Sequence, residues 1–302
     1  MTTGKETHAG FLGMGLDLST DTFTGEEKAR TLEWYGRLHD HGDLDLAPFS
    51  RFMLEHDPVG FKRLRRHLIT LDDEIDGPAL PVAAGVLMFV HTYIVLGMGK
   101  GALYEIIAMR ELGATRAEIM ETVRLGALYG GPRGVNALAE VADGYLRDWH
   151  EDPETESRVA WPAGWAPDPA WFRSGIDLGS DELAPGELEL LRDWYVRTVG
   201  EVPSHVEVLG RLAPRSLKTQ RARFETAITG ALPAQIIPLF TLHLSAVRLW
   251  AAPLRRAVQT ARFLGVRRGE VVAALLWAGV YGADVVMETA MDAAGDLLED
   301  WD

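Results

Sequence analysis

The sequence predicts an all-α protein of two tandem helical domains. No sustained alternation of apolar and polar residues marks a strand. Thr115 and Glu118 form a capping box, after which small and apolar residues recur at helical spacing: Ile119, Val123, Gly126, Ala127 and Gly130. The chain also repeats itself, because a shift of 152 positions aligns residues 79–150 with 231–302 without a gap and with 17 identities, among them His91 with His243.

The repeat divides the chain. We expect a first helical domain at 1–150, of which 1–24 is flexible, and a second at 176–302. Upstream of the gapless match, Trp34-Tyr35 resembles Trp194-Tyr195 at a slightly different offset, which implies small insertions. The connector, 151–175, is rich in proline, acid and tryptophan, and its tryptophans are expected to pack onto the domains.

Composition excludes several classes of function. A formal charge of −14 over 302 residues disfavours nucleic acid or an anionic membrane as partner, which leaves small molecules or proteins. The absence of cysteine excludes disulfides, thiolate metal sites and thiol redox catalysis. The start of the chain shows no apolar core with a cleavage pattern, so we expect a cytoplasmic protein. The uncharged segment Gly77–Gly99 is long enough to span a bilayer, but Pro78 and Pro81 at its start favour a buried core helix.

The stretch GMGKGALYE, Gly97–Glu105, suggests a phosphate-binding loop. A P-loop requires a preceding strand and a serine or threonine after the lysine, whereas here an apolar helix precedes and Gly101 follows Lys100. The counterpart stretch in the second half, 249–257, contains no glycine. We therefore expect these glycines to join two helices.

The order of ELGAT, RAEIMETV and GALYGGPRGVNAL resembles the carboxymuconolactone decarboxylase and AhpD-like family, most clearly over 91–148 and more weakly over 243–300. The resemblance implies a tandem member with two family domains. The family's peroxidase branch uses two cysteines and a histidine, which would fall on Met98, Gly101 and Glu105 here, so thiol peroxidase activity is ruled out. Acid–base chemistry of the decarboxylase branch, without redox cysteines or a cofactor, remains open.

His91 and His243 are candidate catalytic residues because each lies in the most apolar helix of its half. Desolvation would lower the pKa of such a histidine and leave a neutral imidazole that can act as a general base. A core histidine bonded to a backbone carbonyl explains both positions equally well.

Glu105 is the third catalytic candidate, since burial on a face of small residues would raise the pKa of its carboxyl toward neutrality. It could equally form a salt bridge with Arg133. Tyr129 is the fourth candidate, although tyrosines more often pack in the core with a satisfied hydroxyl.

Substrate binding is assigned to Arg133, Asn136 and Tyr281. Arg133 near a helix start could hold a carboxylate by paired hydrogen bonds, and Val285 takes its place in the second half. Asn136 shares a polar helical face with Glu140, which suits a solvated residue as well. The run HDHGD, 39–43, resembles metal ligands, but a solvated helix terminus is the default interpretation and we assign no metal site.

Three classes of function follow. The first is a cofactor-independent lyase or isomerase on a small carboxylated or carbonyl-bearing metabolite, with His91 and Glu105 moving protons and Arg133 holding an anion. The second is a non-catalytic assembly or binding protein with a decayed site, and the third is a metal-dependent enzyme. The family resemblance also implies a ring-like homo-oligomer, for which a trimer of two-domain chains is expected.

Overall fold

A computed structural model describes residues 13–39, 48–74, 80–152, 154–282 and 285–301. All regular structure in these ranges is helical, as the sequence predicts. The helices in chain order are α2 (Gly25–His39), α3 (Pro48–His56), α4 (Pro58–Glu74), α5 (Val82–Leu96), α6 (Gly99–Glu111), α7 (Arg116–Asp148), the short η1 (Pro169–Phe172), α8 (Glu187–Val199), α9 (Ser204–Leu212), α10 (Pro214–Ala227), α11 (Ile236–Val247), α12 (Ala251–Phe263), α13 (Arg268–Gly282) and α14 (Val285–Glu299).

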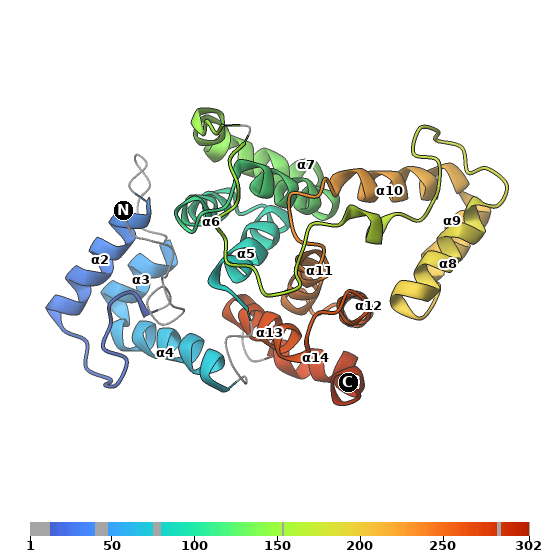
Figure 1. Ribbon diagram of the computed structural model, residues 1–302. Helices are drawn as coiled ribbons and strands as arrows, with labels where there is room; N and C mark the ends of the chain where they lie inside the picture. The colour runs from blue at the N-terminus through green and yellow to red at the C-terminus, as the bar shows by residue number, and fades with distance from the viewer. Residues whose placement is uncertain (1–12, 40–47, 75–79, 153, 283–284, 302) are drawn as a thin grey trace.

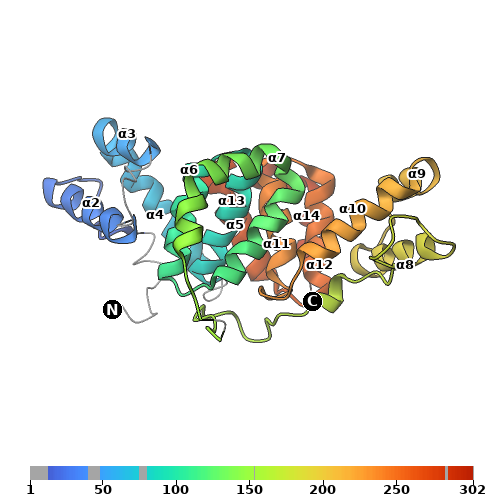
Figure 2. The ribbon, with the colours of Figure 1, turned by 90° about the horizontal axis from the view of Figure 1, so that it is seen from above.

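The molecule consists of a central bundle with a helical arm at each end (Figures 1 and 2). The bundle contains α5 to α7 and α11 to α14, and the apolar helices α5 and α11 pack against each other at its centre. We call α2 to α4 the first arm and α8 to α10 the second arm. In the first arm α2 contacts α6 and α4 contacts α13, and in the second arm α8 contacts α12 and α10 contacts α7. Each arm therefore touches both halves of the chain.

The helix bounds repeat at the offset seen in the sequence. Moving α6 by 152 positions gives the bounds of α12, and α13 corresponds to residues 116–130 of α7. Helix α7 is kinked at Gly131, whose φ is 56° and ψ −156°, and Pro132 follows, so its remainder corresponds to α14. The capping box of Thr115 and Glu118 is present at the start of α7. These matches agree with a duplication, which remains an inference.

Both arms also contain a buried lysine–glutamate pair. Lys62 Nζ lies 2.7 Å from Glu27 in the first arm, and Lys218 pairs with Glu187 in the second. Burial would raise the pKa of each glutamate, but hydrogen bonds from the lysine and from two backbone N–H groups outweigh burial and lower it. The pairs hold each arm together in the same way.

The two halves share one hydrophobic core. One large cluster of buried side chains extends from Leu87 and Ile107 in the first half to Leu239 and Leu275 in the second, and a small separate cluster lies in the second arm. The bounds 1–150 and 176–302 thus describe two halves of the sequence, whose apolar interior is continuous. Among the described helices none is long and apolar enough to cross a membrane.

The glycines of GMGKGALYE join α5 to α6, as expected. Gly97 has a φ of 71° and caps the carboxyl end of α5. Gly99 begins α6 where a Cβ atom would lie 1.8 Å from the Ala137 carbonyl oxygen of α7. These two glycines make a tight turn and a close helix contact, and the following Lys100 is exposed.

Other segments depart in part from expectation. Residues 13–24, expected to be flexible, include the buried Met14, and Lys62 donates a hydrogen bond to the Thr22 carbonyl oxygen, so these contacts favour an ordered segment. In the connector Trp161 and Trp165 pack against the core as expected, whereas Trp171 is 43% exposed and contacts Phe263 edge to face. The run HDHGD lies outside the described residues apart from the backbone of His39.

Candidate functional site

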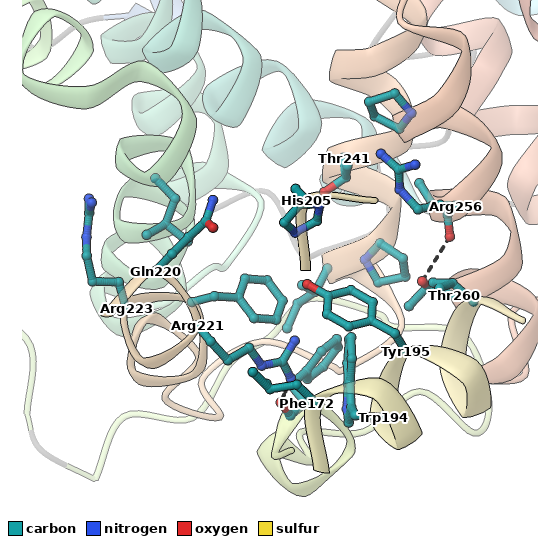
Figure 3. A pocket seen from close by; sticks show the side chains of 18 of the residues that line it. Phe172, Trp194, Tyr195, His205, Gln220, Arg221, Arg223, Thr241, Arg256 and Thr260 are labelled. Atoms are coloured by element: carbon teal, nitrogen blue, oxygen red, sulfur yellow. Dashed lines mark hydrogen bonds between the residues drawn. The ribbon is translucent and has the colours of Figure 1, made fainter. Parts of the chain in front are cut away.

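A cavity of about 390 Å³ lies where the second arm meets the central bundle. Figure 3 shows Thr241 and Arg256 projecting from the bundle helices α11 and α12, with Gln220 and Arg223 on α10 across from them. Leu128 and Tyr129 of α7 complete the wall from the first half of the chain. The remaining lining residues are Phe172, Leu191, Trp194, Tyr195, Val199, His205, Leu217, Arg221, Phe224, Ile237, Pro238, Pro253, Ala257 and Thr260.

The lining is cationic in an acidic protein. Among the residues that the structure describes, no aspartate or glutamate lines the cavity, whereas three arginines do. Arg221 is already neutralised, because its Nε donates to Glu225 at 2.6 Å, and the guanidinium stacks on the Trp194 ring with a separation of 3.7 Å. Arg256 is half-buried and has no ion-pair partner among the described residues. An anionic ligand is the natural partner for that charge.

Two groups suited to proton transfer line the same cavity. The pKa of His205 is lowered, first by burial and then by the charge of Arg256, so its imidazole is neutral near pH 7. The pKa of Tyr129 is raised by burial, against smaller opposing effects of a hydrogen bond with Thr241 at 3.4 Å and of Arg256. Tyr129 is nonetheless 46% exposed because its ring faces the open cavity. A neutral base and a neutral acid therefore share one compartment.

Differences between the halves explain why this side is hollow. Thr241 lines the cavity, whereas the counterpart residue Phe89 is buried and contacts Trp277 and Tyr281 at ring separations of 5.1 Å and 4.6 Å. The large Trp277 corresponds in turn to Leu125 in the first half. Bulky side chains thus fill the counterpart region of the first half, and smaller ones leave space in the second.

Of the predicted site residues, Tyr129 alone lines this cavity. His91 and His243 are buried in the seam between α5 and α11, with exposed fractions of 1% and 0%. His91 stacks on Phe240, and Thr92 Oγ1 lies 2.8 Å from His243 Nδ1. Burial lowers the pKa of each histidine to about 3, although the Leu125 and Trp277 carbonyls oppose the shift. Their surroundings match the structural alternative, a core histidine at a backbone carbonyl.

Glu105 lies in a different place, beside the first arm. Burial raises the pKa of its carboxyl to about 8, in the expected direction, and the charge of Arg65 opposes the shift. Within the described residues the carboxyl has no hydrogen bond or ion pair, so the salt bridge to Arg133 does not form. Tyr93 and Tyr281 pair through their hydroxyls nearby. Burial raises the pKa of both hydroxyls, and the charge of Glu105 adds to the shift. Neither Glu105 nor His91 lines the cavity at the second arm.

The predicted substrate-binding residues do not converge. Arg133 is exposed and its Nε lies over Gly97, 3.4 Å from where a Cβ would be. Asn136 is also exposed, on the part of α7 beyond the kink. Tyr281 lies instead beside Tyr93 and Glu105. The described residues contain no group of three or more histidines and acids that could hold a metal ion.

Sequence reasoning missed His205 and Arg256. Both occupy positions where the two halves differ: at the offsets of their segments, Phe49 stands opposite His205 and Tyr104 opposite Arg256. That asymmetry was the available signal, because a polar side chain introduced into only one half indicates a specialised role. Trp194-Tyr195, noted as a repeated pair, does line the cavity.

Comparisons with protein-family models, with curated proteins and with solved structures give no match to this chain. The resemblance to the carboxymuconolactone decarboxylase and AhpD-like family therefore remains a hypothesis, supported by the quoted segments alone.

Proposed function

We propose that the protein is a lyase or isomerase that uses general acid–base catalysis, independent of a cofactor, on a small carboxylated or carbonyl-bearing metabolite. The reaction takes place in the cavity between the second arm and the bundle. One observation carries the proposal: an unpaired arginine, a neutral imidazole and a neutral phenol line one cavity that contains no acid.

Each group has a role that its environment favours. Arg256 holds the carboxylate and stabilises the negative charge that develops on oxygen when the adjacent C–H bond breaks. His205 accepts that proton, the carbon–carbon double bond of an unsaturated substrate shifts by one position, and Tyr129 donates its phenolic proton to the carbon at the far end of that bond. The imidazolium then returns a proton to the phenolate through water, so the protein ends in its starting state. This assignment moves the acid–base role from His91 and Glu105 to His205 and Tyr129.

Proton exchange tests the proposal directly. Small carboxylates and lactones are incubated with the protein in D2O, and loss of carbon-bound protons is followed by NMR. We expect exchange with the wild-type chain and at least about a 100-fold slower rate for His205→Asn and for Tyr129→Phe. The exposed His150→Asn is the matched control and should exchange at the wild-type rate. Equal rates for His205→Asn and wild type would refute the proposal.

A non-catalytic binding protein is the second candidate, favoured by the sealed position of His91 and His243. In that case a carboxylate would bind in the cavity, and no molecule of the panel would exchange its protons faster than in buffer. Binding and exchange measured on the same samples therefore separate the two functions.

A further inference from the structure

The charge and walls of the cavity narrow the class of ligand, an inference that rests on the proposed function. Three arginines line the cavity, but they are not equivalent. Arg221 is committed to Glu225 and to the Phe172 carbonyl oxygen, and it is buried. Arg223 is exposed, so water screens its charge. Arg256 is left as the single partly buried cation without a partner, which suits one anionic group on the ligand.

The walls are built largely from rings. Tyr129, Tyr195 and Phe224 line the cavity together with the prolines Pro238 and Pro253. Contact between an aromatic side chain and another ring is more favourable than the buried apolar area alone would give. The ligand's apolar part is therefore better matched by a flat or cyclic body than by a flexible chain, which would also lose conformational freedom on binding.

The cavity also limits the size of the ligand and the number of ligand molecules that it holds. The volume of about 390 Å³ lies near the lower end of the range for small-molecule sites, about 300–1,000 Å³, and suits a single ring with a short substituent. The counterpart region of the first half is occupied by Phe89 and Trp277, which are both buried. The cavity at the second arm thus has no equivalent between Phe89 and Trp277, and it has room for one ligand molecule.

We infer that the cavity binds a monocarboxylate whose body is a single aromatic or alicyclic ring, one molecule per chain, with the carboxylate at Arg256 and the ring between Tyr129, Tyr195 and Phe224.

Titration calorimetry on the full chain tests the inference with a fixed set of probes. Benzoate, phenylacetate and cyclohexanecarboxylate are compared with hexanoate, which lacks the ring, with the dianion adipate, and with benzamide, which lacks the charge. We expect the ring acids to bind with a stoichiometry near one and at least about tenfold more tightly than hexanoate, adipate or benzamide. Equal affinity for hexanoate, tighter binding of adipate, or a stoichiometry of two would each overturn the inference.

Two variants locate the carboxylate. Arg256→Gln should weaken benzoate at least about tenfold while leaving benzamide within about twofold. Arg223→Gln, a matched loss of charge at an exposed position, should weaken benzoate by less than about threefold. A larger effect of Arg223→Gln than of Arg256→Gln would overturn the assignment. The probe comparison in the wild-type chain holds even if a variant fails to fold.

The two proposals fail in different ways. If ring acids bind as expected but no carbon-bound proton exchanges in D2O, the ligand class stands and the catalytic function falls. If protons of acyclic or dianionic molecules exchange in the Tyr129- and His205-dependent manner, the function stands and the ligand class is wrong.

Discussion

Glu105 is a carboxyl group that the fold keeps protonated at neutral pH. Its pKa is raised by burial from 4.5 to about 8, and Arg65 only partly opposes the shift. In the unfolded chain the same carboxyl ionises near 4.5, so between these two values the native state binds more protons than the unfolded state. Glu105 therefore costs stability as pH rises through this window.

Replacing Glu105 with glutamine should remove this pH dependence. We expect Glu105→Gln and wild type to have similar free energies of unfolding near pH 4.5. The variant should become the more stable as pH rises to 8, by up to about 1.4 kcal/mol per pH unit. Urea denaturation at several pH values measures the difference. A constant difference across this range would show that the carboxyl is ionised throughout.

At the scale of single helices, one glycine allows two helices to pack closely, whereas another has no packing contact at its Cβ position. A Cβ atom on Gly99, at the start of α6, would meet the Ala137 carbonyl oxygen of α7 at 1.8 Å. Gly144, inside α7, is exposed, and no atom lies within 4 Å of the position its Cβ would take. The same substitution should therefore have opposite effects at the two sites.

Gly99→Ala should lower the free energy of unfolding by about 2 kcal/mol, since α6 and α7 must move apart. Gly144→Ala should raise it by up to about 1 kcal/mol through helix propensity. Chemical denaturation with unchanged slopes gives both values. If both variants shift stability in the same direction, the close contact between α6 and α7 is not as described.

The helices and their bounds could be predicted from the sequence more fully than the site. The Thr115–Glu118 capping box depends on local spacing and is present in the structure, and the bounds of α6 and α12 differ by the 152 positions of the repeat. The cavity depends on how the second arm docks against the bundle and on α10 reaching α7 of the other half. Helical periodicity carries no information about such distant packing. For that reason Tyr129 was found by its position in a motif, while His205 and Arg256 were not.

At the scale of the whole molecule, the seam between the halves contains two buried histidines. The pKa of each is lowered by burial from 6.5 to about 3, and His91 lowers that of His243 further. Below pH 6.5 the unfolded chain gains protons at these residues while the native state does not. The contribution of these two histidines to the free energy of unfolding is therefore greatest above about pH 6.5 and is lost as pH falls toward 3.

Each histidine should lower the free energy of unfolding by up to about 1.4 kcal/mol per pH unit from pH 7 to pH 5, and the opposite contribution of Glu105 offsets part of this fall. The His91→Gln variant should show a shallower slope than wild type over the same range. Denaturant unfolding at half-unit pH steps measures both slopes. A His91→Gln slope equal to that of wild type would contradict the burial of a neutral imidazole at His91.

Tyr129 comes from the first half of the chain and forms a wall of the cavity in the second. Two identical subunits could each contribute a residue to the other's cavity in the same way. Both cavities would then have the same lining, and a substitution that filled one would also fill the other. When the two halves belong to one chain, each can have its own sequence, so the two regions need not have the same lining. One half is free to fill with aromatic rings while its neighbour stays open, and neither is complete without the other.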